Sequence, residues 1–444
     1  AITSTLYTER LVNMPIQQMF LGLGAAGDKY WYLLYGDYSA NSELYEDLVL
    51  DSSDNIYVGG YADGGGGVGR DWIITKYDKE GAMQYQRSAF SNQSDEIRAL
   101  NIDNSGNIYM YGKTDRQQFA RLSTNQSLSY QKRNFYYSAS DYGAENNGNT
   151  LYVASSGPKP GYVFSHNNTF GVYDGRSFSK GSGSGGNKNI AISDMAIDSS
   201  NNVICVGKGE DFPHPGGGGV DTNMALIIKF NSSLTEQWAR TIGGSGNSAF
   251  FGVGTDSSDN IYAFGVDGTG GQKTLMVKYN SSGTIQWQRT LASPCTGGTF
   301  HSVTDSSGNS YVCGKQQNQH AWVAKINSSG GTVWCRTWES SGGSDEQEFK
   351  SIALDSKGNI IICGVHHPGN RIALLIKLPN DGSLTGTHGA FTYAAASPSN
   401  STTSIGSITS VGLNFGSISD LMQGSLSMTL DTPSFPTPTV VDID

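Results

Sequence analysis

Charged residues are scarce in this 444-residue chain, at 15%, and its 29 Lys and Arg residues form no basic tract. The formal net charge is −10, and no Lys or Arg follows Lys377. Nucleic acids and anionic lipid surfaces are bound mainly through clustered basic side chains. We therefore expect neither nucleic acid nor an anionic membrane surface among the partners.

Long apolar segments are also missing. The chain has no run of eighteen apolar residues, and no charged and apolar leader precedes its first polar stretch. We expect no membrane insertion. The five cysteines (Cys205, Cys295, Cys313, Cys335 and Cys363) are odd in number and contain no CxxC, so we expect mostly free thiols.

What the chain has in abundance is glycine and aromatic residues: 58 Gly, 23 Tyr, 17 Phe and 7 Trp. Aromatic residues favour strands, and frequent glycines favour the turns between short strands. This composition predicts an all-β protein.

One unit recurs along the chain. It begins with Asp, has Asn four residues later, continues with a β-branched or aromatic run, and ends on Gly nine residues after the Asp. Six copies begin at Asp51, Asp103, Asp198, Asp256, Asp305 and Asp355. A seventh, decayed copy has Glu145, Asn149 and Ala154 at these positions. A period of about fifty residues is typical of propeller blades, and seven copies predict a seven-bladed β-propeller.

A second signal follows in most units: an apolar strand that ends in Lys, a turn, and a strand with Trp or Tyr followed by Arg. Examples are Lys229 with Trp238 and Arg240, and Lys278 with Trp287 and Arg289. The two signals together predict four strands per blade. Because Lys and Arg recur in successive units, we interpret them as structural. The recurring Asp is expected to bond turn amides, with calcium binding as the alternative that the spacing leaves open.

The units resemble bacterial β-propeller repeats of the Asp-x-x-Gly-Asn-x-Tyr-Val-x-Gly type over residues 29 to 385. The turn before the Trp is also similar to that of pyrroloquinoline-quinone-type propellers and, more loosely, to sialidase Asp-boxes. The resemblance implies the fold and hardly constrains the function, because propellers host enzymes, lectins and scaffolds alike.

Three segments are expected. Residues 1–28 form an N-terminal arm, 29–393 the propeller, and 394–444 a Ser- and Thr-rich, strand-forming extension. The strand Tyr30 to Leu34 should close the ring by completing the last blade, with Thr385 to Tyr393 as its rival. Arm and extension have no evident partner within a closed ring, so we expect them to carry assembly, through Leu11, Met14, Met19, Phe20, Val411, Phe415, Leu426 and Leu430. Residues 29–393 alone should then be a heat-stable monomer.

Ligand binding is expected on the long, irregular loops that leave one end of the ring. The candidate residues are Tyr61, Asp71, Phe212, His214, His320 and His367. We identify no catalytic residues, no metal site and no cofactor, since the histidines of these loops have no carboxylate at ligand spacing and no catalytic constellation can be defended.

Arm, propeller and strand-forming extension together resemble the layout of bacteriophage virion proteins. The first hypothesis is thus a non-enzymatic virion protein of a phage tail, spike or fibre. It would bind other virion proteins or its own copies through the termini, and a host-surface glycan or receptor through the propeller. The alternative is a bacterial surface or secreted lectin-like propeller, and the third possibility is a propeller enzyme.

Overall fold

The computed structural model describes residues 17–23, 29–36, 42–63, 69–90, 95–113, 117–124, 128–132, 142–146, 150–155, 161–167, 172–180, 190–210, 223–243, 246–268, 273–297, 299–316, 320–340, 345–389, 391–403, 407–408, 413–417 and 429–431. None of these residues belongs to a helix long and apolar enough to cross a membrane.

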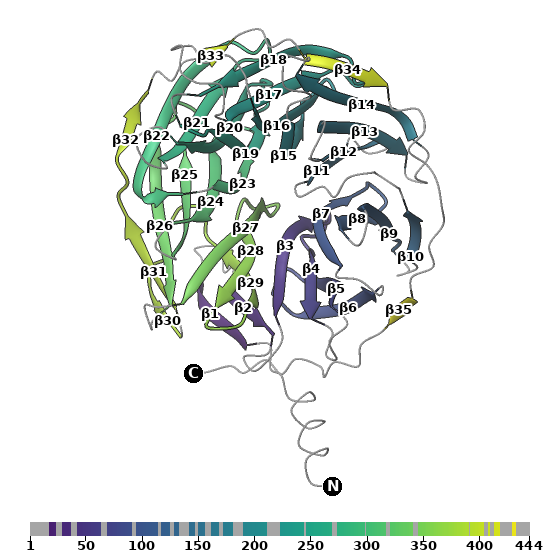
Figure 1. Cartoon of the computed structure of the whole chain (residues 1–444). Helices are drawn as coiled ribbons and strands as arrows, with labels where there is room; N and C mark the ends of the chain where they lie inside the picture. The colour runs from purple at the N-terminus through teal and green to yellow at the C-terminus, as the bar shows by residue number, and fades with distance from the viewer. Residues whose placement is uncertain are drawn as a thin grey trace, which may run out of the picture.

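The described strands form seven antiparallel sheets arranged around a common axis (Figure 1). We number the sheets in chain order. Each sheet places one strand innermost, and each innermost strand contacts the innermost strands of both neighbouring sheets, so that the ring is continuous. The all-β propeller fold expected from the composition and the repeats is confirmed.

Sheets 1 to 4 each run in chain order from the innermost strand outward. Sheet 1 is β3 (Glu43–Leu50), β4 (Ile56–Asp63), β5 (Arg70–Tyr77), β6 (Met83–Phe90) and β35 (Thr429–Asp431). Sheet 2 is β7 (Glu96–Ile102), β8 (Ile108–Lys113), β9 (Gln117–Leu122) and β10 (Leu128–Lys132). Sheet 3 is β11 (Tyr142–Asn146), β12 (Thr150–Ser155), β13 (Gly161–Asn167), β14 (Val172–Lys180) and β34 (Leu413–Ser417). Sheet 4 is β15 (Ile190–Ile197), β16 (Val203–Gly209), β17 (Met224–Phe230), β18 (Glu236–Ile242) and β33 (Ser407–Ile408).

Of the remaining three sheets, sheets 5 and 6 take their outer strands from the C-terminal segment and sheet 7 takes its outer strands from the N-terminal segment. Sheet 5 is β19 (Ala249–Thr255), β20 (Ile261–Asp267), β21 (Lys273–Tyr279), β22 (Ile285–Thr296) and β32 (Asn400–Thr402). Sheet 6 is β23 (Thr299–Thr304), β24 (Ser310–Lys315), β25 (Ala321–Ile326), β26 (Thr332–Ser340), β31 (Phe391–Ala396) and β30 (Gly386–His388). Sheet 7 is β27 (Glu346–Leu354), β28 (Ile360–His367), β29 (Ile372–Leu378), β2 (Lys29–Tyr35) and β1 (Gln17–Leu23).

The ring is closed by the N-terminal strand β2, which pairs antiparallel with β29 through Trp31 and Lys377 at one end and Tyr35 and Ala373 at the other. This part of the prediction is confirmed. However, β2 is the fourth strand of sheet 7 and not its outermost one, because β1 pairs along its other side. The rival segment lies elsewhere, in β30 and β31 on sheet 6.

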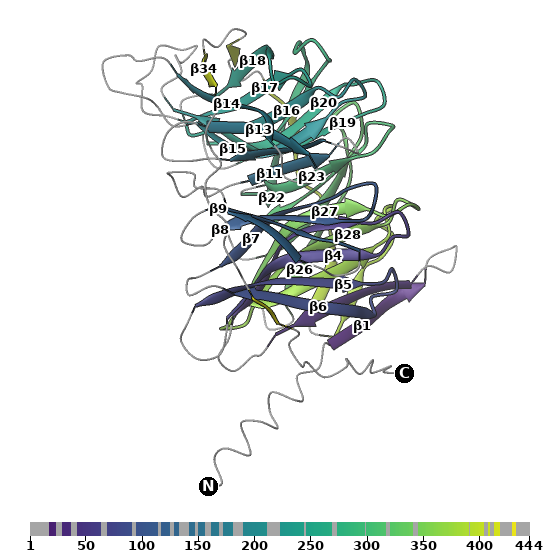
Figure 2. The ribbon, with the colours of Figure 1, turned by 90° about the vertical axis from the view of Figure 1, so that its right-hand side faces the viewer.

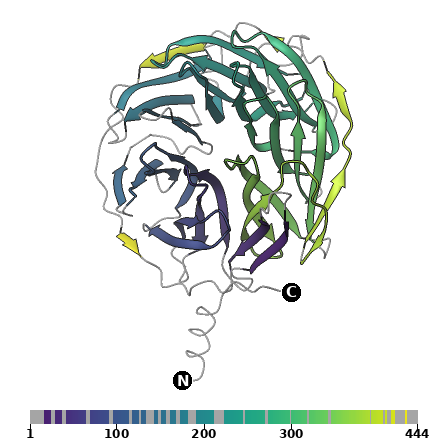
Figure 3. The ribbon, with the colours of Figure 1, turned by 180° about the vertical axis from the view of Figure 1, so that it is seen from behind.

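The C-terminal segment forms what we call the tail belt, the strands β30 to β35. After leaving sheet 6, the belt adds one outer strand to sheets 5, 4 and 3 in turn and then one to sheet 1. It therefore follows the rim of the ring in the direction opposite to the sheet order (Figure 3). The strands β1 and β34 lie on opposite sides of the ring in two perpendicular views (Figures 1 and 2).

The predicted architecture of seven four-stranded blades with two free appendages is wrong. Among the described strands only sheet 2 has four, while six of the seven sheets carry at least one more. The additional strands β1 and β32 to β35 come from the segments expected to be arm and extension, whereas β30 and the start of β31 come from the end of the segment expected to be propeller. The physical reason is edge protection, because the unpaired N–H and C=O groups of each outer strand are satisfied by the chain itself.

The hydrophobic core lies between neighbouring sheets. One buried cluster combines Ile204 and Ile227 of sheet 4 with Phe250, Leu275 and Val277 of sheet 5. Another combines sheet 6 with sheet 7 and extends to Phe391 and Tyr393 of the tail belt. Sheet faces are thus covered on both sides by their neighbours, which explains the continuous apolar runs of the middle strands.

The glycine that ends each repeat is explained by a bulge in the innermost strand. In sheets 1, 2, 4, 5, 6 and 7 the register of the innermost strand shifts by one residue opposite this glycine. At Gly207, an added Cβ would overlap the carbonyl oxygen of Ala191 on the bulged strand. Sheet 3, the decayed copy, has Ala154 at this position and no register shift. The bulge therefore requires glycine at the facing position of the second strand.

The recurring Asp and Asn form a hydrogen-bonded turn, as expected. In the first copy, Asp51 Oδ1 accepts the N–H groups of Ser53 (2.9 Å) and Asn55 (3.0 Å), and the Asn55 amide donates to Oδ2 (2.8 Å). Burial acts to raise the pKa of Asp51, but the hydrogen bonds from Asn55 outweigh it and lower the pKa. Internal donors thus account for the recurrence of the carboxylate.

The recurring Lys, Trp and Arg join sheets 4, 5, 6 and 7 to the sheet that follows each, which confirms their structural interpretation there. From sheet 4, the Lys229 ammonium and the Trp238 indole N–H both donate to the carbonyl of Ser281 (3.2 Å each), and Arg240 donates to that of Gly283 (3.2 Å). Lys229 also forms a buried ion pair with Asp198 (2.7 Å). Trp238 lies against Gly283, which has φ +79° and whose added Cβ would come within 2.7 Å of the indole. Equivalent indole bonds join Trp287 to Ser328 and Trp334 to Asn380.

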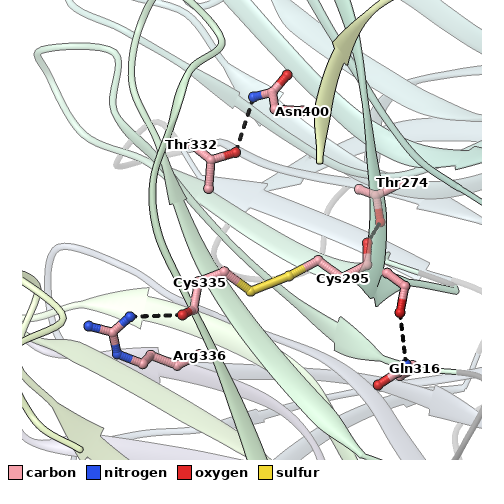
Figure 4. The surroundings of a disulfide bond; sticks show 8 residues. Thr274, Cys295, Gln316, Thr332, Cys335, Arg336 and Asn400 are labelled. Carbon is pink, nitrogen blue, oxygen red and sulfur yellow. Dashed lines mark hydrogen bonds between the residues drawn. A yellow bond between two sulfur atoms is a disulfide. The ribbon is translucent and has the colours of Figure 1, made fainter. Parts of the chain in front are cut away.

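The cysteines divide into one bonded pair and three free thiols. Cys295 of β22 and Cys335 of β26 form a disulfide that joins sheets 5 and 6 (Figure 4). Cys205, Cys313 and Cys363 are free and buried. The expectation of mostly free thiols holds for these three and is wrong for Cys295 and Cys335.

Candidate functional site

The two ends of the ring differ in the kind of connection that they carry between strands. The Asp–Asn turns, and the turns whose carbonyls accept the Lys, Trp and Arg hydrogen bonds, lie at one end, which we call the turn end. At the other, the loop end, the innermost strands begin and the irregular connections lie. The bulges fall in the first half of the innermost strands and therefore near the loop end.

Bulged residues of three adjacent sheets carry charges, namely Lys350 (sheet 7), Glu46 (sheet 1) and Arg98 (sheet 2). Glu46 lies 3.9 Å from the Lys350 ammonium and 3.3 Å from the Arg98 guanidinium. One carboxylate thus bridges two cations and three sheets. Bulges redirect side chains and are frequent beside functional sites.

The charges continue in both directions. Lys350 pairs with Glu348, Arg98 pairs with Glu96, and Glu96 also pairs with Arg70, which lies 3.7 Å from Asp63. We call these seven residues, which alternate in sign, the inner rim: Asp63, Arg70, Glu96, Arg98, Glu46, Lys350 and Glu348. Arg70 and Asp63 are more than one third exposed, whereas Glu96 is only 9% exposed. The inner rim therefore runs from solvent to a buried carboxylate.

The electrostatics of the inner rim follow from this pairing. Burial acts to raise the pKa of Glu96, but Arg98 and Arg70 outweigh it and lower the pKa. Arg371, directly before β29, donates a hydrogen bond to the Tyr61 hydroxyl (2.9 Å), which raises the pKa of this arginine. The charged forms of Glu96 and Arg371 are therefore stabilised, and the site offers both donors and acceptors.

A second set of polar residues lies one position beyond the bulges. Asp47 accepts the N–H of Leu100 in sheet 2 (2.7 Å), and Asp194 accepts that of Val253 in sheet 5 (2.9 Å). His301 of sheet 6 lies 3.7 Å from Asp194. Burial raises the pKa of Asp47 despite the opposing effect of His301. These carboxylates satisfy edge N–H groups of the adjacent innermost strands.

The predicted ligand-binding residues differ in burial and in their contacts. Tyr61 is 1% exposed, with the Arg70 guanidinium 4.1 Å above its ring, so it supports the inner rim instead of facing solvent. Asp71 is half-buried. Its pKa is raised mainly by burial and, to a smaller extent, by the negative charge of the nearby Asp63. His320 and His367 are half-buried at the loop end, and His367 lies 3.8 Å from Glu346. Phe212 and His214 lie outside the described residues.

Of the residues expected to carry assembly, four lie on strands that pair within the chain. Met19 and Phe20 belong to β1, Phe415 to β34 and Leu430 to β35. Leu11, Met14, Val411 and Leu426 lie outside the described residues. Because the chain itself supplies strand partners, the argument that arm and extension must find them in another molecule no longer follows.

His366 and His367 of the loop end each lie within 4 Å of one carboxylate, that of Asp345 and that of Glu346. In the described part of the chain, no group of three or more His, Cys, Asp or Glu side chains could hold a metal ion. His366 is 3% exposed, bonds Gln347 (3.3 Å) and packs edge-on against Phe391 of the tail belt at 4.9 Å. Its role in this structure is packing.

His366 predicts acid sensitivity. Burial lowers its pKa to about 4, although Asp345 acts in the opposite direction. The folded state therefore favours the neutral imidazole, so the stabilisation is fully present above the unfolded pKa of about 6.5 and is lost as the pH falls from 6.5 to 4. We expect a loss of about 3 kcal/mol in the free energy of unfolding over this window. Denaturant titrations of His366→Gln should lack this component, whereas the half-buried neighbour His367→Gln should keep it. Equal pH profiles for the wild type and His366→Gln would contradict the assignment.

The inner rim was not foreseen from the sequence, because its members come from strands up to three hundred residues apart. The available signal was the glycine within a strand, which is a known sign of a bulge. It would have marked Glu46, Arg98 and Lys350, since each lies opposite such a glycine.

Comparisons with known proteins concern the fold. No protein-family model matches the chain, and no curated protein matches it significantly. Solved structures that are similar include the Dos1 propeller, with 9% identity, a TM-score of 0.46, and coverage of 82% of this chain and 95% of that one. YCF48 from Cyanidioschyzon merolae has 10% identity, a TM-score of 0.46, and coverage of 78% and 98%. The polysaccharide lyase Uly1 has 10% identity, a TM-score of 0.47, and coverage of 83% and 99%. Similarities of this size give no basis for transferring an activity.

Proposed function

We propose that this chain is a non-enzymatic binding protein that recognises its partner at the loop end of the ring. Within this proposal, the setting is a virion, as part of a phage tail, spike or fibre, and the partner is a host-surface glycan or receptor, or a neighbouring protein. A bacterial surface or secreted lectin-like protein remains the alternative setting.

The observation that carries the proposal is the different use of the two ends. At the turn end, the recurring Asp, Lys, Trp and Arg groups form hydrogen bonds and ion pairs within the ring and so stabilise the fold. At the loop end, the inner rim exposes guanidinium and carboxylate groups beside one another. Scaffolds of this kind place recognition on irregular loops carried by a rigid body.

The sign pattern indicates the kind of partner. Alternating charges cancel over a few ångströms, so the inner rim would not attract a polyanion, but it offers paired donors and acceptors to a neutral or zwitterionic polar surface. Hydroxyl groups of a glycan and mixed-charge protein surfaces both satisfy this requirement.

The test uses the inner rim and a matched control at the opposite end. Arg70→Ala combined with Arg371→Ala removes two exposed cations of the loop end, and Lys79→Ala removes an exposed cation of the turn end. We expect the double variant to lose at least about tenfold in binding to host cells or an immobilised glycan panel while the ring stays folded, because Arg98 still pairs with the buried Glu96. Lys79→Ala should bind normally. Full binding by the double variant would refute the site, and absence of the protein from purified particles would refute the virion setting.

A further inference from the structure

The disulfide lies at the place where the tail belt passes from one sheet to the next. In β22, Leu291 pairs with Thr274 and Thr296 pairs with Lys273, so residues 292–295 bulge out of the register with β21. This four-residue bulge carries Cys295, whose carbonyl accepts the Thr274 hydroxyl (2.7 Å) and whose sulfur bonds Cys335 of sheet 6. The bulge thus reaches from sheet 5 to sheet 6.

The same bulge contacts the tail belt. The N–H of Ala292 donates to the carbonyl of Ser399 (3.0 Å), directly before β32 pairs with β22. On the other side of the crossing, Cys335 is the register partner of Ala396 in β31. The disulfide and residues 396–400 therefore bridge the same two strands.

Asn400 adds a third bridge at this point (Figure 4). Although it belongs to a strand on sheet 5, its amide donates to the Gly330 carbonyl (2.7 Å) and the Thr332 hydroxyl (3.1 Å) of sheet 6. The belt can make these bonds and both strand pairings only while β22 and β26 keep their present separation. A covalent bond between the two strands fixes that separation.

We propose that the Cys295–Cys335 disulfide is a redox-controlled clasp for the tail belt. Oxidised, it holds the two outer strands in the geometry that the crossing requires. Reduced, it leaves the crossing to hydrogen bonds alone, and the belt is released from sheet 5 onward. Belt and disulfide stabilise each other, because an energetic coupling between two sites acts equally in both directions.

The chemistry requires a dithiol reductant. One of its thiolates attacks Cys295 or Cys335 and forms a mixed disulfide, and its second thiolate then displaces the protein sulfur. The reductant becomes a disulfide, and two protons convert both protein sulfurs to thiols. Both cysteines are 0% exposed, so the attack requires local opening of the crossing. The protein's own free thiols attack this disulfide poorly, because burial raises the pKa of Cys205, Cys313 and Cys363 and so disfavours their thiolate forms.

Limited proteolysis of the full chain tests the clasp. Trypsin has no site after Lys377, so chymotrypsin is used, with Phe415 of β34 as the reporter of the part of the belt beyond the crossing. We expect dithiothreitol to speed belt cleavage about tenfold. With or without dithiothreitol, the Cys295→Ser/Cys335→Ser variant should be cleaved as fast as the wild type is in dithiothreitol. Cys205→Ala should respond to dithiothreitol like the wild type. Equal cleavage rates for oxidised and reduced wild type would overturn the proposal.

The reciprocal measurement needs no cysteine substitution. Asn400→Ala weakens the belt crossing and leaves the disulfide in place. Mass spectrometry of alkylated thiols should show faster reduction of the disulfide by dithiothreitol, by several fold, than in the wild type. An unchanged reduction rate would separate disulfide from belt and contradict the coupling.

Discussion

Replacing Gly207 by alanine should cause one of the largest losses of stability that a single methyl group can cause in this chain. The new Cβ would overlap the carbonyl oxygen of Ala191 on the bulged strand β15. Since the neighbouring sheets hold β15 in place, relief requires the bulge to be removed or the two strands to separate. We expect the free energy of unfolding to fall by about 3 kcal/mol, the upper part of the range for overpacking, as measured by denaturant unfolding.

The decayed copy provides the matched control. Ala154 lies at the same position of the repeat in sheet 3, where β11 and β12 pair without a register shift. Ala154→Gly should therefore cost the conformational entropy of glycine, roughly 0.5 to 1 kcal/mol, and the burial of one methyl group, about 0.8 kcal/mol, because Ala154 is buried. If Gly207→Ala were as mild as this control, the bulge would not be the reason for the recurring glycine.

The propeller could be predicted because its signals are local and repeated. Turn chemistry at Asp51 and Asn55, strand patterning, and the Lys, Trp and Arg that join neighbouring sheets each recur within a single unit, so one copy supports the next. Position in the repeat even separated structure from function correctly for Lys229 and Arg240. The closing strand could be inferred because the last unit lacked its fourth strand.

The tail belt could not be predicted by the same reasoning. Each belt strand is short, and its pairing partner is set by the path of the chain around the rim and not by a pattern in its own residues. The disulfide has the same difficulty, since Cys295 and Cys335 meet only after sheets 5 and 6 have packed. The inner rim depends on bulges that bring together residues of three sheets. In each case the missing information is tertiary.

Tyr61 illustrates why a loop position is a weak indicator of a binding residue. An aromatic residue at the end of a strand was expected to face a ligand. The structure instead buries it beneath Arg70 and against Arg371. Cations over an aromatic face stabilise the site and orient their own charges, so the recognition groups at this position are the arginines.

Removing residues 397–444 should convert the ring into an aggregating protein. The strand pairing of the tail belt thus reverses the expectation that residues 29–393 alone form a stable monomer. The truncation takes away β32 to β35 and leaves β22, β18, β14 and β6 as unpaired outer edges. Each lost ladder hydrogen bond contributes roughly 0.5 to 1.5 kcal/mol, and each open edge can pair with another molecule.

We expect the truncated chain to melt roughly 10 °C lower than the full chain and to form concentration-dependent oligomers in light scattering after size-exclusion chromatography. A shorter truncation, of residues 432–444, removes no described belt strand and should leave both properties unchanged. The comparison separates edge protection from a general effect of shortening. A monomeric 1–396 chain with the melting temperature of the full protein would mean that the outer edges need no cover. A lower melting temperature together with self-association would assign the belt two roles, the stabilisation of its own ring and the exclusion of strands from other molecules, whereas self-association at an unchanged melting temperature would leave only the second.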